Sequence, residues 1–109
     1  MFELQFNQAE KKATLIGDMT IYSAMEAKHQ LSAIAQEPGL LLLDLSALSE
    51  LDSAGAQLLM ALKKQRSINK LDTTFASHSD AVLETFELLG LVSYFGDPVV
   101  IEKWRSSNP

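Results

Sequence analysis

Four consecutive leucines, Leu40 to Leu43, constrain the fold of this chain more than any other stretch of its sequence. The run is far too short for a membrane helix, which needs about 20 apolar residues. Pro38-Gly39 precedes it as a turn, and a short apolar segment bounded by turn residues is typical of a strand covered on both faces. We therefore expect residues 40–45 to form a fully covered strand at the centre of a sheet.

The start of the chain has the pattern of a β-hairpin. Phe2, Leu4 and Phe6 alternate with polar residues, and this period of two indicates a strand with one buried face. Residues 7–12 are polar and provide a turn, and residues 13–17 are typical of a second strand. A hairpin is therefore predicted ahead of the leucine strand.

A helix is predicted between the hairpin and the leucine strand. Ser23 precedes Glu26 by three residues, the spacing at which a capping box satisfies backbone N–H groups at a helix start. Apolar residues at helical spacing follow, so we expect a helix over residues 24–36. Residues 46–51, after the leucine strand, are predicted to form a loop.

The second half of the chain predicts a helix, a strand and a third helix. Asp52-Ser53 supplies a residue type that caps helices, and the apolar spacing after it predicts a helix that ends near Ser67. Residues 71–76 are typical of a strand, and Gly90 is placed to end the last helix. The apolar stripes expected on the two helices are Leu58, Leu59 and Leu62, and Val82, Leu83, Phe86 and Leu89.

The order of these elements predicts the α/β class: one domain over residues 1–109, with a mixed, mostly parallel β-sheet, a leading β-hairpin and helices packed against the sheet. The length of 109 residues suits a single hydrophobic core. Two interpretations of residues 99–101 stay open, a final edge strand or the start of a short helix that carries Trp104.

Charge and composition exclude several classes of partner. The formal net charge is −5, and the nine Lys and Arg residues are scattered, so we expect no nucleic-acid binding and no direct membrane insertion. There are no cysteines, which excludes disulfides and thiolate metal sites. The first residues lack a basic segment followed by a long apolar run, so no signal peptide is predicted and a cytoplasmic location is expected.

The chemistry of an enzyme is poorly represented. His29 and His78 lack metal-ligand spacing and are predicted to be surface residues. The five glycines are isolated, so neither of the usual phosphate-binding loops is present. Ser53 follows a buried strand but lacks the GxSxG pattern of a hydrolase nucleophile, which makes a hydrolase the weakest interpretation. We therefore expect no catalytic residue, no metal and no cofactor.

The segment over residues 40–62, LLLLDLSALSELDSAGAQLLMAL, resembles the central motif of the STAS family, the sulfate transporter and anti-sigma factor antagonist domains. Gly17 to Thr20 and Leu89 to Leu91 are also similar to that family, so the resemblance covers nearly the whole chain. It implies a single STAS-like domain.

The resemblance also implies a function. In the switch members of the family, the Ser after the motif Asp is phosphorylated by a partner kinase that is also the anti-sigma factor, and that position is Ser53 here. The next residue is often Ser or Thr in those members, whereas here it is Ala54. The resemblance thus implies an anti-sigma factor antagonist, and we expect a monomer or weak dimer. An alternative is a stand-alone STAS subunit of an ABC-type phospholipid transport complex that binds its ATPase.

The residues around Ser53 are expected to form the surface that binds the partner. A helix start favours a phosphate, while the added charge beside Asp52 would weaken docking. Ala54, Gly55 and Ala56 are small and allow close approach, and Ser53, Gln57, Met60 and Lys64 share one helical face. The candidate partner-binding residues are therefore Asp52, Ser53, Ala54, Gly55, Gln57, Met60 and Asp44.

Simpler interpretations stand beside this one. Asp52 and Ser53 together are explained by helix capping alone when only their spacing is considered. Met60 is equally consistent with packing at the edge of the core. Asp44 is either a family-type position at a strand end or an ordinary solvated carboxylate.

Overall fold

The computed structural model of the chain describes residues 1–91. It contains a four-stranded sheet in the order β1-β2-β3-β4 and three helices. The first two strands pair antiparallel, and the other pairs are parallel. This confirms the predicted α/β class and the leading hairpin. The elements are β1 (Phe2–Asn7), β2 (Lys12–Met19), α1 (Ala24–Ser32), β3 (Leu40–Leu51), α2 (Ser53–Ile68), β4 (Asp72–His78) and α3 (Asp80–Leu88).

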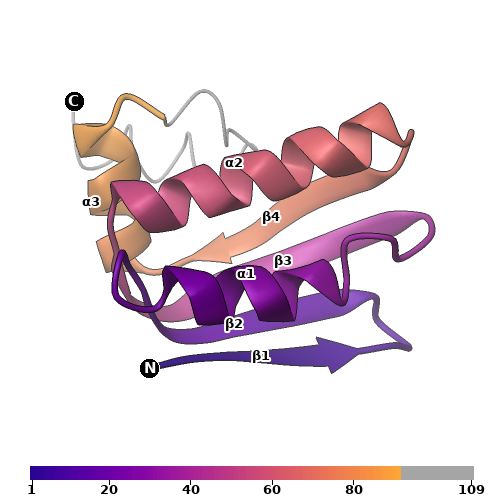
Figure 1. Ribbon diagram of the computed structural model, residues 1–109, viewed down its shortest axis with the longest axis horizontal. Helices are drawn as coiled ribbons and strands as arrows, with labels where there is room; N and C mark the ends of the chain where they lie inside the picture. The colour runs from indigo at the N-terminus through magenta and orange to yellow at the C-terminus, as the bar shows by residue number, and fades with distance from the viewer. Residues whose placement is uncertain (92–109) are drawn as a thin grey trace.

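Helices α1 and α2 lie side by side over the sheet, and α3 lies at the end where β3 and β4 finish (Figure 1). The apolar side chains on the helix-facing side of the inner strands form one core with the helices. Leu15, Leu43 and Leu59 illustrate it, since all three have no exposed surface. The predicted segment over residues 99–101 lies outside the described residues.

Strand β3 is an inner strand, as predicted, but it is not fully covered. Leu41, Leu43 and Leu45 are completely buried, whereas Leu42 is half-buried and Leu40 is 47% exposed. The prediction of complete coverage was therefore wrong. Helices α1 and α2 cover one face of the strand, so burial alternates along it even where every residue is a leucine.

Strand β3 is also longer than predicted, because residues 46–51 are strand and not loop. Leu48 pairs with Gly17, and Leu51 pairs with Met19 at the end of β2. These leucines are three residues apart and do not alternate strictly. Two irregularities in the β2–β3 register absorb the extra residues, as β-bulges do, and keep both leucines buried.

Helix α1 is shorter than predicted, and the capping box at its start does not form. The helix ends at Ser32, and turns occupy residues 33–36. Ser23 makes no side-chain cap hydrogen bond. Its hydroxyl instead accepts a hydrogen bond from the N–H of Thr20 at 2.9 Å and donates to the carbonyl of Asp18 at 2.9 Å. Ser23 therefore stabilises the turn before the helix.

The end of α3 follows the prediction. Gly90 has φ +68°, the left-handed conformation that favours glycine. Its N–H donates to the carbonyl of Glu87 at 3.1 Å, and the N–H of Leu91 donates to the carbonyl of Phe86 at 2.7 Å. This pair of hydrogen bonds is a Schellman motif, which satisfies the last carbonyls of the helix.

The far end of α2 contains a fully buried arginine that the sequence analysis missed. The guanidinium of Arg66 donates to the carbonyls of Glu37 at 2.9 Å, Gly39 at 3.0 Å and Asp72 at 2.9 Å. It also donates to the hydroxyl of Thr73 at 2.8 Å. One side chain thus joins the turns after α1 to the starts of β3 and β4.

Candidate functional site

The candidate site lies at the end of the molecule where α1, α2 and α3 begin (Figure 1). Strands β2, β3 and β4 run parallel, so their carboxyl ends meet there. In open α/β sheets this is the edge at which ligands usually bind. The topology therefore presents the start of α2 at the edge where a functional surface is expected.

Asp52 is the cap of α2 and also holds the neighbouring turn. One carboxylate oxygen accepts a hydrogen bond from the N–H of Gly55 at 3.0 Å, and the other accepts from the N–H of Ile21 at 2.9 Å. The end of β3 is fixed from a further direction, because the hydroxyl of Thr85 in α3 donates to the carbonyl of Leu51 at 2.7 Å. The start of α2 is therefore held in place from both sides.

These hydrogen bonds set the ionisation of Asp52. Partial burial alone would raise the pKa of its carboxyl group, but hydrogen bonds from the N–H groups of Gly55, Ile21 and Ala54 outweigh this effect. The pKa of Asp52 is therefore held below its ordinary value of 3.8. The side chain is an anion at neutral pH, one residue before Ser53.

Ser53 is the first residue of α2, and its side chain is exposed. Asp52 is the residue that caps the helix, so the side chain of Ser53 is not needed for capping. Ala54 is half-buried, and Gly55 and Ala56 are buried. A Cβ atom on Gly55 would lie 2.0 Å from the carbonyl oxygen of Met19. Gly55 therefore allows α2 to pack closely against β2. It is buried, so its effect on the surface is to set the position of the helix start.

The expected face along α2 is only partly accessible. Gln57 and Lys64 are exposed, as a docking face requires. Met60 is half-buried and packs against the core cluster, which favours its interpretation as a residue at the edge of the core. The exposed polar side chains of the first turns thus lie near Ser53, while Met60 contributes only part of its surface.

Asp44 does not join the start of α2. It lies in β3, seven residues before the end of this strand at Leu51, which corresponds to about 23 Å at about 3.3 Å per strand residue. Its carboxylate accepts hydrogen bonds from the N–H of Ser46 at 2.9 Å and from the hydroxyl of Ser46 at 2.6 Å. Partial burial alone would raise the pKa of Asp44. The hydrogen bonds from Ser46 and the charge of Lys12 have a larger, opposite effect, so the pKa lies below its ordinary value.

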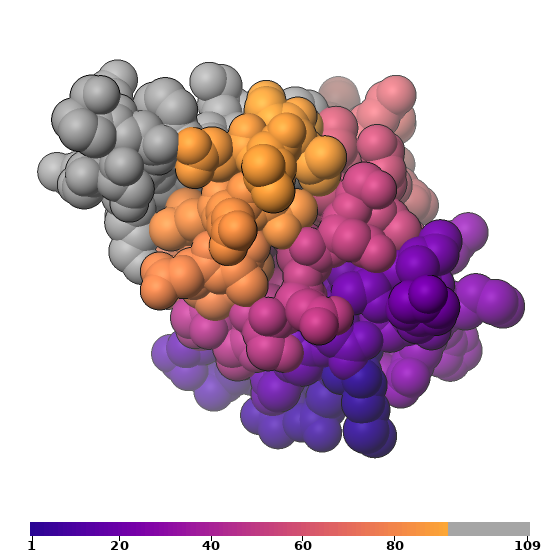
Figure 2. All heavy atoms as spheres, turned by 90° about the vertical axis from the view of Figure 1, so that its left-hand side faces the viewer, coloured from indigo at the N-terminus to yellow at the C-terminus, as the bar shows by residue number. Residues whose placement is uncertain are grey.

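Three exposed apolar side chains beside Ser53 were missed from the sequence. Ile21 is 64% exposed, Tyr22 is 96% exposed and Met25 is 89% exposed. Ile21 and Tyr22 lie in the turn that Asp52 holds, and Met25 is in the first turn of α1. The signal in the sequence was the presence of three large apolar residues within the five positions 21–25. Figure 2 looks at this end of the molecule and shows the start of α2 between α3 and the beginning of α1.

His78 is buried, so its prediction as a surface residue was wrong. It is 4% exposed at the end of β4, and its ring meets the ring of Phe86 edge-on at 5.9 Å between centroids. Helix α3 folds back over the end of the strand and covers this histidine. His29 is exposed on α1, as predicted.

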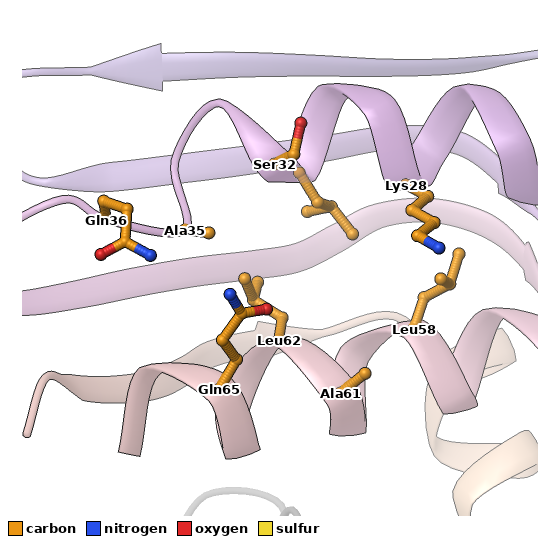
Figure 3. A pocket seen from close by; sticks show the side chains of 9 residues that line it. Lys28, Ser32, Ala35, Gln36, Leu58, Ala61, Leu62 and Gln65 are labelled. Carbon is orange, nitrogen blue, oxygen red and sulfur yellow. The ribbon is translucent and has the colours of Figure 1, made fainter. Parts of the chain in front are cut away.

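A groove runs between α1 and α2 from one turn beyond Ser53 (Figure 3). Its volume is about 230 Å³, below the roughly 300–1,000 Å³ of typical small-molecule sites. Apolar side chains of both helices line it, together with the polar side chains of Lys28, Ser32, Gln36 and Gln65. We therefore interpret it as a helix–helix packing groove.

Other kinds of site are not found within residues 1–91. No group of three or more His, Cys, Asp or Glu side chains is arranged to hold a metal ion there. No helix in the same part of the chain is long and apolar enough to cross a membrane.

The chain is similar to known proteins along nearly its full length. A family model described as Mlab, STAS domain matches residues 2–99. The anti-sigma factor antagonist SpoIIAA in its unphosphorylated form is 16% identical, with 97% of each chain covered and a TM-score of 0.64. An anti-sigma factor antagonist from Mycobacterium paratuberculosis is 20% identical, with 96% of this chain and 93% of that chain covered and a TM-score of 0.63.

The Bacillus cell fate determinant SpoIIAA in its phosphorylated form is also similar. It is 15% identical, with 86% of this chain and 87% of that chain covered and a TM-score of 0.60. No curated protein matches the chain. At these identities the solved structures establish a shared fold.

Proposed function

The chain belongs to the STAS domain family, and from this premise we propose that it is a regulatory docking protein that acts as an anti-sigma factor antagonist. It binds a serine kinase of the anti-sigma type through the start of α2, and phosphorylation of Ser53 releases that partner. The contact surface includes Asp52, Ala54 and Gln57, with part of Met60. Gly55 allows the close packing of this surface, and Asp44 lies outside it.

The observation that carries the proposal is the exposure of Ser53 beside a separate cap. A kinase needs an accessible hydroxyl group, and Ser53 is exposed at the first position of α2. Asp52 satisfies the N–H of Gly55, so the Ser53 hydroxyl is not required as the cap. Modification of Ser53 therefore leaves the capping hydrogen bond in place.

The charge of a phosphate explains how modification would act. A phosphoserine adds about −1.5 to −2 charges, beside an aspartate that is already ionised. The helix start tolerates this charge through its N–H groups. A docked partner surface would instead meet a hydrated dianion. The phosphorylated and unphosphorylated forms of SpoIIAA support a cycle of this kind in a protein of the same fold.

The proposal includes the setting in which the protein works. It is a single cytoplasmic domain of bacterial type, a monomer or weak dimer, without catalytic turnover of its own. Purified protein should therefore hydrolyse neither ester nor nucleotide substrates. Robust turnover that Ser53→Ala abolishes without loss of the fold would contradict the docking function.

Phosphorylation is tested by incubating the purified chain with ATP and each anti-sigma-type serine kinase of the source organism. The expected result is one added phosphate on the intact protein, located at Ser53 by peptide mass spectrometry. Ser53→Ala should abolish the added mass, while Ser67→Ala, a control at the other end of α2, should not. Phosphate that remains on Ser53→Ala would place the modification elsewhere.

A second candidate uses the same surface without phosphorylation. The chain would then be a STAS subunit of an ABC-type phospholipid transport complex and would bind its ATPase through the start of α2. Ala54 favours this candidate, because the switch members often carry Ser or Thr there. Co-purification of an ATPase whose binding is unchanged by kinase and ATP would support it over the first.

A further inference from the structure

The junction of β2 and α1 exposes a cluster of large apolar side chains. Ile21, Tyr22 and Met25 are 64%, 96% and 89% exposed and lie within five residues of one another. A cluster of this kind is uncommon on a soluble domain unless it serves in binding. Elsewhere in residues 1–91 the exposed large apolar residues are single, as Ile68 is at the end of α2, except for the adjacent pair Leu88 and Leu89 at the end of α3.

Hydrogen bonds hold the turn that presents this cluster. The N–H of Thr20 donates to the hydroxyl of Ser23 at 2.9 Å, and the N–H of Ser23 donates back to the carbonyl of Thr20 at 3.0 Å. The N–H of Ile21 donates to the carboxylate of Asp52 at 2.9 Å. Because the backbone is fixed before binding, little ordering of the turn opposes association.

The cluster is continuous with the surface around Ser53. One oxygen of the Asp52 carboxylate holds Ile21, and the other caps α2 through Gly55. In Figure 2 the beginning of α1 and the start of α2 lie next to each other on the face toward the viewer. A partner that covers Ser53 therefore also reaches the apolar cluster.

Within residues 1–91, the charged side chains on the segments next to the cluster are mostly acidic, and the N-terminal ammonium group of Met1 is already paired with Asp18. Asp52, Glu26 and Glu50 lie on the adjoining segments, and the last two are exposed. Lys28 is the first cation along α1, and its side chain turns into the groove toward Leu58 (Figure 3). A second copy of this chain would place like charges against one another, and an anionic membrane would be repelled.

We propose that Ile21, Tyr22 and Met25 form an apolar anchor that inserts into a hydrophobic socket of a protein partner bordered by Lys or Arg residues. This inference rests on the docking function proposed above and specifies the partner chemistry of the same surface. Aromatic and methionine side chains are enriched at protein interfaces, where a few anchors carry most of the affinity.

The test begins with a photoreactive benzoylphenylalanine at position 22, irradiated in cells of the source organism. Mass spectrometry then identifies the crosslinked segment. A protein segment with apolar residues beside Lys or Arg is the expected product. A crosslink to a second copy of this chain, to lipid, or to a segment without nearby basic residues would contradict the proposal.

The crosslinked protein is then purified and titrated with variants of the chain. Tyr22→Ser and Met25→Ser should each weaken binding at least about tenfold. Ile68→Ser, which removes an exposed apolar side chain at the other end of α2, should change it less than about twofold. Glu26→Lys should weaken binding severalfold at low salt and less at high salt, since salt screens exposed charges. Glu10→Lys, in the distant β1–β2 turn, is the matched charge control.

Ser53→Glu in the same titration separates this inference from the proposed function. Loss of affinity in Ser53→Glu with normal affinity in Tyr22→Ser and Met25→Ser would overturn the anchor and leave the switch intact. Loss of affinity in the two anchor variants with normal affinity in Ser53→Glu would support the anchor and overturn the switch. Equal affinity for all variants would overturn both.

Discussion

The two ends of α2 differ in how they treat polar and apolar groups. Where α2 finishes, Arg66 is fully buried and donates hydrogen bonds to carbonyls of Glu37, Gly39 and Asp72. Where α2 begins, the large side chains of Tyr22 and Met25 are almost fully exposed. One end buries a charge with its partners around it, and the other leaves apolar surface in water.

Under the docking function proposed above, this difference separates a contact that stabilises the fold from a surface that binds the partner. The guanidinium of Arg66 links α2 to the turns after α1 and to the starts of β3 and β4, and it is buried, so its role is structural. The exposed apolar side chains of Tyr22 and Met25 bury little surface in the free protein, and the proposed anchor gives them a role in binding. Predictions about the two ends should therefore separate into effects on the free energy of unfolding and effects on partner affinity.

Arg66→Ala should have the largest effect on stability. It leaves several carbonyl groups without their donor, at about 1–3 kcal/mol for each buried unsatisfied group, so we expect a total loss of about 3–5 kcal/mol. Urea denaturation measures this loss. Lys64→Ala, an exposed neighbour, should change stability by less than about 0.5 kcal/mol. A loss below about 1 kcal/mol for Arg66→Ala would remove the contrast between the two ends.

Gly55→Ala should destabilise the functional end. Its Cβ atom would lie 2.0 Å from the carbonyl oxygen of Met19, so α2 must shift away from β2. We expect a loss of about 1–3 kcal/mol in urea denaturation, the usual effect of overpacking. Partner affinity should also fall, because the shift moves Ser53. A variant with unchanged stability would show that the close approach is not required.

Asp52→Asn should have a smaller effect that depends on pH. Asparagine also caps helices well, but its single amide oxygen cannot accept hydrogen bonds from the N–H groups of both Gly55 and Ile21 as the two carboxylate oxygens do. The loss of one such hydrogen bond should lower stability by about 0.5–1.5 kcal/mol. Because the folded pKa of Asp52 lies below 3.8, its contribution is complete above that value and disappears as the pH falls through the folded pKa. Wild type and variant should therefore differ at pH 7 and converge at low pH in paired urea titrations. A constant difference across pH would contradict the role of the carboxylate.

Tyr22→Ser should have the smallest effect on stability, within about 0.5 kcal/mol, because the side chain is 96% exposed. Its effect should fall on partner affinity alone. Thermal unfolding of wild type and variant, followed by circular dichroism, measures the first part. A clear loss of stability would mean that Tyr22 packs within the free domain, and the comparison between the two ends would weaken.

The sequence predicted the elements whose signal is local. The leucine run gave an inner strand, and the Asp52 cap with its apolar spacing gave α2. Gly90 ended α3 as expected, because its left-handed conformation is specified by residue type. The extension of β3 was not predictable from its own residues. It depends on pairing with β2 through bulges, which leave only the irregular spacing of Leu48 and Leu51 as a signal.

The features that the sequence did not reveal depend on contacts between distant segments. Arg66 is the only charged side chain that is fully buried within residues 1–91, and its carbonyl partners lie up to 32 positions away. His78 is buried because α3 folds over it. The hydroxyl of Ser23 could form either a capping box or a turn, and its bonds to Thr20 and Asp18 decide between them.

Only the part of the candidate site that depends on neighbouring residues in the sequence was predicted. Ser53 and Asp52 were identified because the motif and the cap are local. The apolar neighbours at Ile21 and Tyr22 are about 30 positions earlier in the chain. They reach the site through the pairing of β2 with β3 and through the hydrogen bond from Ile21 to Asp52. Asp44 is close to Ser53 in sequence, but the extended strand between them separates the two residues.

The central claim, that a charge at Ser53 controls docking and not folding, is tested most directly by titration calorimetry of the purified partner with three forms of the chain. Ser53→Ala should bind as wild type does, and Ser53→Glu should lose about 2 kcal/mol or more of binding free energy. The stability of Ser53→Glu should stay within about 1 kcal/mol of wild type, because a carboxylate suits a helix start. Equal affinities for wild type, Ser53→Ala and Ser53→Glu would contradict the claim and leave Ser53 as an ordinary first residue of α2.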